Sequence, residues 1–365
     1  MRIGIPREIK PLEARVALVP SACGDLVRAG HEVLVEHGAG EPSGFADVDY
    51  LSVGAQVLPD AAALYERAGL VVKVKEPWGP ELDLLRRDHL VFSFLHLAAD
   101  SALTDRLLAI GLTAVGFETV ADGGALPILR PMSDIAGRLA VQIGAALLHA
   151  PQGGKGLLLG GTPAAGRGHV VVLGAGNAGG AAIAAAADLG ARVTAFVRDP
   201  AKLVALHRVG PNVTGLYPYA EALARAVAEA DLLIGAVLVP GARAPRLVSA
   251  AQVAAMSPGS VIVDISVDQG GCVETTHPTT YADPTYRVHG VVHFGVTNMP
   301  GAVPRSASLA LSASLLPWVL RLASPRWRAD APLAGAINVS DGDLVHPALR
   351  LEGCEKAREE PGARL

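Results

Sequence analysis

The stretch that most constrains the fold of this 365-residue chain covers residues 169–200. It begins with a short apolar run over residues 170–173. Three glycines with the spacing G-x-G-x-x-G follow the run, at Gly174, Gly176 and Gly179. An alanine-rich segment from Asn177 onward then predicts a helix, and residues 193–197 predict a second strand. This order of strand, glycine turn, helix and strand indicates one βαβ unit of a parallel sheet.

Each glycine of this turn has a physical reason. The first permits the sharp turn, the second lets backbone N–H groups approach a pyrophosphate, and the third lets the helix pack close to the sheet. Because the flanking strands and the helix are all present, we interpret the turn as a dinucleotide site rather than a bare packing turn. The expected cofactor contacts of the turn are Gly174, Ala175, Gly176, Asn177, Ala178 and Gly179.

The end of the second strand indicates which nicotinamide dinucleotide is favoured. A site for NAD(H) usually places Asp or Glu about twenty residues after the first glycine, where it binds the ribose hydroxyls. This chain has Val197 followed by Arg198, so no carboxylate repels a 2′-phosphate and a guanidinium can bind one. We therefore expect NADP(H), with Val197 and Arg198 in contact with the cofactor. In the alternative, Arg198 is a solvated loop residue and Asp199 serves the ribose of NAD(H).

Composition and charge argue against several other classes of protein. The formal net charge is −4 and no basic tract is present, which disfavours nucleic acid and an anionic membrane surface as partners. The sequence has no run of about eighteen apolar residues and no signal-type N-terminus, so we expect a cytoplasmic protein. The three cysteines are far apart, and His289 and His293 fall in a segment typical of extended chain. We therefore expect neither a disulfide framework nor a metal site.

Apolar runs alternate with amphipathic segments along most of the chain, which predicts two α/β domains. The expected architecture is two Rossmann-like domains with mostly parallel sheets, separated by a cleft. We expect a substrate (catalytic) domain over residues 1–130 plus about 305–365, and a dinucleotide-binding domain over residues 131–304. A helix over residues 133–149 would lead from the first domain to the second, and an apolar helix over residues 307–322 would return the chain to the first.

Ligands of open parallel sheets bind beyond the carboxyl ends of the strands, so residues at those ends are candidates for the site. They are Arg15 in the loop after the first strand, Lys75, His96, Glu118, and Asp268, which we expect to close a strand over residues 261–267. Arg15 can bind a carboxylate through two parallel hydrogen bonds, and Lys75 offers a compact cation for a carbonyl or carboxylate oxygen. His96 can exchange a proton with a carbonyl or carbinolamine oxygen near neutral pH, and Asp268 can activate water or ammonia.

Each candidate also has a purely structural interpretation. Lys75 could extend along the sheet edge, as could Lys73 on the same strand face. His96 follows an apolar run and could be a core histidine. Asp268 could cap the turn that follows it, and Glu118 could cap or pair locally.

Ten segments of the chain occur in the order seen in bacterial alanine dehydrogenases: VALVP, KVKEP, FSFLHLA, ETV, PMSDIAGRLA, GAGNAG, IGAVLVPGARAP, VDISVDQGGC, PTTY and TNMPGAVP. The chain resembles that family over residues 1–345, and the family resembles the soluble nucleotide-binding domain of proton-translocating transhydrogenase. The resemblance implies that Arg15 and Lys75 bind the substrate and that His96 and Asp268 are catalytic, with Lys75 also taking part in the chemistry. Glu118 and Asn298 complete the expected substrate contacts.

The resemblance further implies cofactor contacts outside the glycine turn. They are Ser133, Val237, Leu238, Asp268 and Asn298. Members of the family form homohexamers, so a homo-oligomer is expected. The chain departs from the family at Val197, where an aspartate is usual, and in the segment after Gly353.

These observations together predict an oxidoreductase that interconverts a small L-amino acid, by default alanine, with its 2-oxo acid and ammonia. Two alternatives stay open at this point. The first is an NADPH-dependent imine reductase, such as an N-(1-carboxyethyl)amino acid synthase, which would use the same site with a larger amine. The second is a non-catalytic nucleotide-binding protein similar to the transhydrogenase domain.

Overall fold

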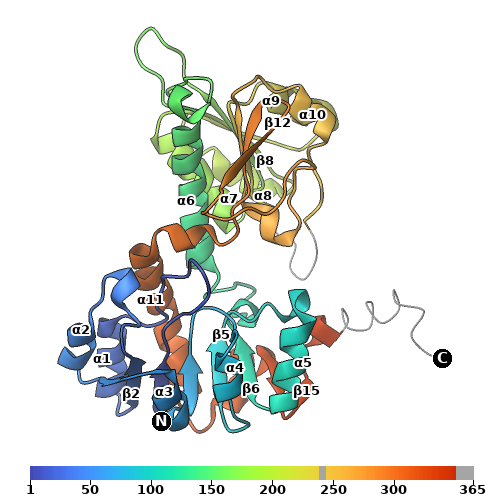
Figure 1. Ribbon diagram of the computed structural model, residues 1–365. Helices are drawn as coiled ribbons and strands as arrows, with labels where there is room; N and C mark the ends of the chain where they lie inside the picture. Colours follow the sequence, from blue (N-terminus) through green and yellow to red (C-terminus); the bar gives the residue numbers. More distant parts are fainter. Residues whose placement is uncertain (238–243, 351–365) are drawn as a thin grey trace. The chain divides into compact units, whose positions relative to one another are not determined.

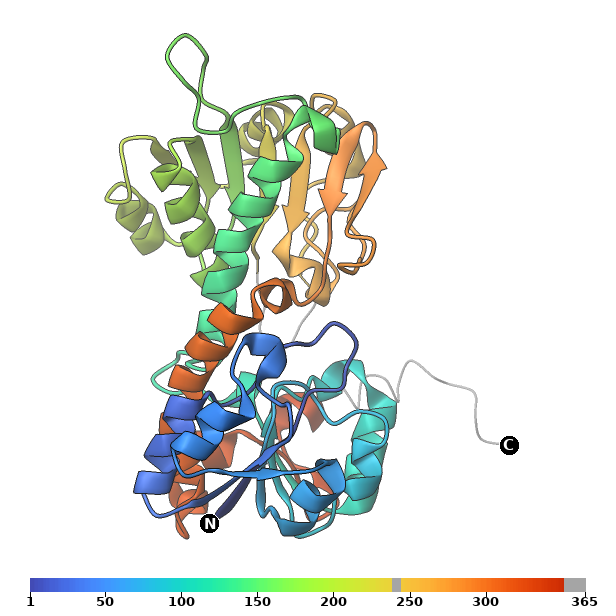
Figure 2. The same cartoon turned by 60° about the vertical axis from the view of Figure 1, so that its left-hand side comes forward.

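The computed structural model describes residues 1–237 and 244–350, and this part of the chain divides into two compact units (Figure 1). Unit 1 comprises residues 1–132 and 303–350, and unit 2 comprises residues 133–237 and 244–302. Each unit is a mostly parallel sheet with helices on both of its faces (Figure 2). The fold class predicted from the sequence is therefore confirmed.

Among the described residues, the sheet of unit 1 has eight strands in the order β15-β14-β6-β5-β4-β1-β2-β3. The strands are β1 Arg2–Ile5, β2 Glu32–Glu36, β3 Gln56–Leu58, β4 Leu70–Val72, β5 Leu90–Ser93, β6 Thr113–Gly116, β14 Ile337–Ser340 and β15 Asp343–Leu344. Strands β1 to β6 pair in parallel, whereas β14 is antiparallel to β6 and to β15. The carboxyl ends of β1 to β6 therefore meet at one edge of the sheet.

The α-helices of unit 1 are α1 Pro20–Arg28, α2 Asp47–Ser52, α3 Ala61–Arg67, α4 Glu81–Leu84, α5 Ser101–Ile110, α11 Pro304–Leu322 and α12 Ala331–Gly335. Short 3₁₀ turns are η1 Glu41–Ser43, η2 Leu97–Ala99, η3 Phe117–Thr119 and η7 Trp327–Ala329. Helix α11 anchors the loop that follows β1, because its Ser308 and Ser312 hydroxyls accept the N–H groups of Val16 and Val19 at 2.9 and 3.0 Å. These two bonds fix the chain directly after Arg15.

Unit 2 has a seven-stranded sheet within the described residues, in the order β12-β13-β11-β10-β7-β8-β9. The strands are β7 His169–Leu173, β8 Arg192–Phe196, β9 Val213–Leu216, β10 Leu232–Gly235, β11 Val261–Asp264, β12 Thr285–Val288 and β13 Val291–Phe294. Only β12 runs antiparallel to its neighbour. Strand β7, helix α7 and strand β8 form the βαβ unit that the sequence predicts. The extended segment around His289 is the β12–β13 hairpin, with His289 at its turn and His293 buried in β13.

The α-helices of unit 2 are α6 Arg130–Leu147, α7 Asn177–Asp188, α8 Pro200–Leu206, α9 Ala220–Ala228 and α10 Ala250–Ala254. Its 3₁₀ turns are η4 Ala150–Gln152, η5 Ile265–Gln269 and η6 Met299–Ala302. Helix α6 begins at Arg130, three residues before the predicted start, and so includes the last residues of the first segment of unit 1. Within the described ranges, no helix combines the length and the apolar character needed to cross a bilayer.

Two strands end earlier than the sequence suggests, and in both cases a buried carboxylate binds the backbone near the strand end. The strand predicted over residues 261–267 stops at Asp264, because the Asp264 side chain accepts the Ser266 N–H at 3.0 Å and so starts the turn η5. The prediction that Asp268 closes this strand is therefore wrong. Strand β4 stops at Val72. Directly after it the N–H of Val74 donates to Glu8 at 2.6 Å, while the carbonyl of Val74 accepts the N–H of Phe94 at 3.1 Å.

Candidate functional site

In unit 1, the loop after β1 contains a buried pair of opposite charges. Arg15 is 3% exposed, and its Nε and Nη2 donate to the two carboxylate oxygens of Glu13 at 2.7 and 2.6 Å. The backbone N–H of Arg15 donates to the same carboxylate at 3.0 Å, and Nη1 lies 3.3 Å from the sulfur of Met132. This bidentate pair fixes the plane of the guanidinium. The edge that could meet a substrate carboxylate is thus the one formed by Nη1 and Nη2.

Lys75 belongs to the same group of charges. Burial acts to raise the pKa of Glu13, but the hydrogen bonds and charge of Arg15, together with the Lys75 ammonium, hold this pKa below its ordinary value. Burial likewise acts to raise the pKa of Glu76, but groups that include Lys10 and Lys75 lower this pKa below its ordinary value. Glu13 therefore interacts with both predicted substrate cations. The charges of Arg15 and Lys75 therefore both act on one buried carboxylate.

Lys73 is more deeply buried than Lys75, which is half-buried. It is 1% exposed, and its ammonium lies 3.2 Å from a carboxylate oxygen of Glu8 and 3.1 Å from one of Glu81. Burial acts to lower the pKa of Lys73, but the two carboxylates raise it above its ordinary value. The hydroxyl of Tyr65 donates to Glu81 at 3.0 Å and completes this interior group. The interpretation of Lys73 as a side chain extended along the sheet edge is therefore wrong.

His96 follows β5 and presents an exposed imidazole. Its backbone is left-handed, with φ of 48°, and its ring stacks on Phe94 with centroids 5.8 Å apart and planes 7° apart. The carboxylate of Glu118, after β6, accepts the N–H of Leu95 at 3.1 Å and that of His96 at 2.7 Å. The interpretation of His96 as a buried core residue is therefore wrong. Glu118 holds the turn that carries His96, and this backbone role differs from the substrate contact that was expected.

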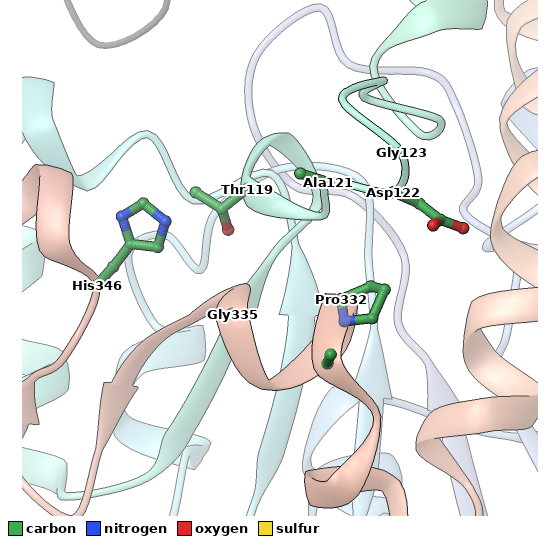
Figure 3. A pocket seen from close by; sticks show the side chains of 8 residues that line it. Thr119, Ala121, Asp122, Gly123, Pro332, Gly335 and His346 are labelled. Atoms are coloured by element: carbon green, nitrogen blue, oxygen red, sulfur yellow. The ribbon is translucent and has the colours of Figure 1, made fainter.

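A cavity of about 420 Å³ lies next to η3 in unit 1 (Figure 3). Its lining includes the polar side chains of Thr119, Asp122 and His346. Burial lowers the pKa of His346, and the carboxylate of Glu118 opposes this effect, so the imidazole lies within reach of the Glu118 charge. Figure 3 shows the His346 ring and the Asp122 carboxylate well apart, with Thr119 between them in the view. None of the residues predicted for the site contributes to this lining.

In unit 2, the glycine turn has the geometry of a phosphate cradle. Gly174 has φ of 96°, and a Cβ there would lie 2.6 Å from the carbonyl oxygen of Ala236. A Cβ on Gly179 would overlap the carbonyl oxygen of Gly174, so α7 packs directly on the turn. A Cβ on Gly176 would meet no protein atom within 4 Å, and Gly176 is exposed before the first turn of α7. The outer two glycines thus serve packing, whereas the middle one keeps space in front of a helix N-terminus, which fits a dinucleotide pyrophosphate. The rest of the turn is Ala175, Asn177 and Ala178.

The chain directly after β8 contains the residues on which the two interpretations of the cofactor depend. Val197 is 6% exposed, and its N–H donates to the carbonyl of Leu216 on the neighbouring strand at 2.9 Å. The Arg198 side chain is exposed. Asp199 is the N-cap of α8, and its carboxylate accepts the N–H of Ala201 at 2.9 Å. The carboxylate that would have to bind a ribose is therefore already engaged in capping a helix.

Strand β11 ends in a buried carboxylate that holds two loops. Asp264 is 1% exposed; one oxygen accepts the N–H of Ser266 at 3.0 Å, and the other accepts the N–H groups of Cys272 and the next residue at 2.9 and 3.2 Å. Burial raises the pKa of Asp264 in spite of these three donors. The hydroxyl of Ser266 in turn accepts the N–H of Val237 at 2.9 Å. Asp264 thus positions η5, which carries Asp268, and through Ser266 the backbone that follows β10.

The remaining predicted contacts also lie in unit 2. Asp268 is exposed in η5, Ser133 is half-buried in the first turns of α6, and Asn298 is half-buried just before η6 with φ of 60°. Leu238 lies outside the residues that the structure describes. The assigned contacts of these residues with substrate or cofactor stay predictions.

Sequence reasoning missed three buried carboxylates that support the site, Glu8, Glu13 and Asp264, and it misplaced the buried Lys73 at the sheet edge. Glu13 stands two residues before Arg15, and this spacing is the one signal that could have indicated their pairing. Asp264 stands at the true end of β11, so the rule of strand ends finds it once the strand is given its correct length. Glu8 and Lys73 are far apart in the chain, and no local pattern indicates that they meet.

Comparisons with known proteins give a consistent result. A model described as Alanine dehydrogenase/PNT, N-terminal domain, matches residues 4–136, and one described as Alanine dehydrogenase/PNT, C-terminal domain, matches residues 140–347. The chain is 46% identical to an alanine dehydrogenase of Mycolicibacterium smegmatis over 358 residues, which covers 96% of each chain. A solved L-alanine dehydrogenase is 52% identical with a TM-score of 0.94, covering 97% of this chain and 99% of the other. A solved transhydrogenase of Sinorhizobium meliloti is 29% identical with a TM-score of 0.82, covering 95% of this chain and 100% of the other.

Proposed function

Because the chain belongs to the alanine dehydrogenase/PNT family, we propose that this dehydrogenase interconverts L-alanine with pyruvate and ammonia, and that it uses NADP(H) in preference to NAD(H). The family membership supports the reaction. The choice of cofactor is supported by features of this chain that lie in unit 2.

The residues directly after β8 are the observation that supports NADP(H) as the cofactor. A buried Val197 stands where a carboxylate would bind the ribose and repel a phosphate, and an exposed Arg198 follows it. A guanidinium binds a phosphate in bidentate fashion, which favours a cofactor with a 2′-phosphate. Asp199 is the competing group, and its bond to the N–H of Ala201 opposes a role at the ribose.

The residues of unit 2 that would hold the dinucleotide are those of the glycine turn and the loops held by Asp264. The space over Gly176 and the start of α7 would accept the pyrophosphate, and the backbone after β10 is fixed by the bond from Val237 to Ser266. The bound nicotinamide supplies or accepts the hydride of the reaction.

In unit 1, Arg15 and Lys75 would bind the oxo acid. The guanidinium, held in plane by Glu13, orients the carboxylate, and the Lys75 ammonium stabilises negative charge on the carbonyl oxygen. His96 presents an exposed imidazole and would give a proton to the oxygen that leaves as water, or take it back in the reverse direction. Asp268 of unit 2 would accept a proton from the attacking ammonia or, in the oxidative direction, from water.

Steady-state assays test this proposal. The protein is assayed with pyruvate and ammonium in the presence of NADPH, and then with other 2-oxo acids and with primary amines larger than ammonia. We expect the highest kcat/KM with pyruvate and ammonium. Turnover only with a larger amine would replace the proposal by an imine reductase, and absence of any turnover would support a non-catalytic nucleotide-binding protein.

A further inference from the structure

We propose that the buried carboxylate of Glu8, acting together with Lys73, is a positioning residue for Lys75. This inference rests on the proposed function, because it takes Lys75 as a residue that contacts the oxo acid. All three residues lie in unit 1, on the segments that follow β1 and β4.

Glu8 accepts hydrogen bonds from the backbone N–H groups of Lys75 and of the residue before it. Its side chain is 2% exposed, one carboxylate oxygen accepts the N–H of Val74 at 2.6 Å, and the other accepts that of Lys75 at 3.3 Å. A parallel neighbour strand would otherwise satisfy such N–H groups. The carboxylate thus takes the place of a strand for these two N–H groups, while the carbonyl of Val74 still accepts the N–H of Phe94 at 3.1 Å.

Lys73 donates hydrogen bonds to the backbone carbonyls of Lys75 and of the residue after it. Its ammonium donates to the carbonyl of Lys75 at 3.2 Å and to that of Glu76 at 3.4 Å, and it also donates to Glu8 at 3.2 Å. The peptide groups before and after the Lys75 Cα are therefore both held by one buried ion pair. The direction in which the Lys75 side chain leaves the backbone depends on these bonds.

The charges of the buried cluster formed by Lys73, Glu8 and Glu81 indicate that the cluster does not serve stability alone. One ammonium faces two buried carboxylates, from Glu8 and Glu81, and burial raises the pKa of Glu8 against the effect of Lys73. Buried ion pairs contribute little net stability compared with apolar side chains of similar volume. Their directional bonds to backbone groups do fix a loop in one conformation, as a substrate-binding loop requires.

Glu81 offers a matched control within the same cluster. It is 3% exposed and lies 3.1 Å from the Lys73 ammonium, so its burial and its charged partner match those of Glu8. Its other bonds are to the N–H of Trp78 at 2.9 Å and to the hydroxyl of Tyr65 at 3.0 Å. These bonds join Glu81 to Lys73, Trp78 and Tyr65, and they do not involve Lys75.

The test compares Glu8→Gln, Glu81→Gln and Lys75→Met with the wild type in the pyruvate and ammonium assay at saturating NADPH. We expect Glu8→Gln to raise the KM for pyruvate about tenfold, in the same direction as Lys75→Met, because hydrogen bonds to a charged acceptor are lost beside the lysine. Glu81→Gln should keep this KM within about twofold of the wild-type value, although it should lower the melting temperature about as much as Glu8→Gln does. The KM for NADPH should stay unchanged in all three variants.

The KM is the informative quantity because a partly unfolded preparation loses apparent kcat without a change in KM. Equal effects of Glu8→Gln and Glu81→Gln on the KM, or no effect of Glu8→Gln while Lys75→Met raises it, would overturn the inference. If Glu8→Gln does not fold, Glu8→Asp carries the test, since it keeps the charge facing Lys73 but shortens the reach to the N–H groups; an unchanged KM in that variant overturns it as well. No turnover of the wild type would instead refute the proposed function, and with it this inference.

Discussion

Replacement of His96 by asparagine should abolish most of the activity and leave the fold intact. In the proposed reaction His96 moves a proton at the oxygen of the substrate. Groups with this role contribute a factor of about 10² to 10⁴ in rate, or roughly 3–5.5 kcal/mol of transition-state stabilisation. His96→Asn should therefore lower kcat by about two to four orders of magnitude.

The position of His96 predicts that stability changes little. The imidazole is exposed and its ring stacks on Phe94, a kind of contact worth about 0.5–1.5 kcal/mol. Its φ of 48° is left-handed, and asparagine tolerates this conformation better than alanine does, so the substitution adds little backbone strain. The N–H that donates to Glu118 is retained in the variant. For a unit of this size we expect a melting temperature lowered by roughly 1–6 °C.

The assay pairs single-turnover or steady-state kinetics with a thermal melt of the same preparation. A large loss of kcat with an almost unchanged melting temperature would agree with the proposed chemistry. Near-normal turnover in His96→Asn would show that the imidazole is not a proton donor, and an unfolded variant would show that its role is structural.

Three further predictions concern the two units separately. Arg15→Lys should chiefly raise the KM for the oxo acid, because an ammonium cannot reproduce the planar fork that Glu13 holds; an unchanged KM for every oxo acid tested would remove Arg15 from the site. Asp264→Asn should destabilise unit 2 by about 1–3 kcal/mol and weaken NADPH binding, because the amide nitrogen of asparagine cannot accept a hydrogen bond and at least one of the three N–H groups loses its partner. A thermal melt measures the first effect and a cofactor fluorescence titration measures the second. Unchanged values for both would contradict the role we assign to Asp264. Burial lowers the pKa of His293 below its ordinary value of 6.5, so the unfolded chain binds the proton more readily and stability is lost as the pH falls below about 6.5. Relative to wild type, His293→Gln should become more stable as the pH is lowered from 7 to 5, and a melting-temperature difference that does not vary with pH would contradict this.

The local part of the fold is readable from the sequence because it depends on neighbouring residues. The glycine spacing, the apolar run before it and the alanine-rich segment after it specify β7, the turn and α7 without reference to the rest of the chain. The candidates at strand ends follow from the same logic, since Lys75, His96 and Glu118 do follow β4, β5 and β6. Their positions are set by the parallel topology.

The supporting contacts are not readable in this way, because they join residues that are distant in the sequence. Glu8 meets the N–H of Val74 and the ammonium of Lys73 only after β1 and β4 have paired. The end of β11 is another case, since an apolar pattern continues past Asp264 and only the buried carboxylate shows where the strand stops. Hydrophobic periodicity describes which residues are buried, and it does not show where a buried charge will redirect the backbone.

The most direct test of the account is the ratio of kcat/KM for NADPH to kcat/KM for NADH, measured with pyruvate and ammonium at one fixed salt concentration. The salt concentration is fixed because ions screen a phosphate contact at the exposed Arg198. A partly exposed guanidinium–phosphate contact contributes roughly 1.5–3 kcal/mol, so we expect NADPH to be favoured by about ten- to a hundredfold, and Arg198→Ala to remove most of this preference. Equal or higher efficiency with NADH in the wild type would contradict the account.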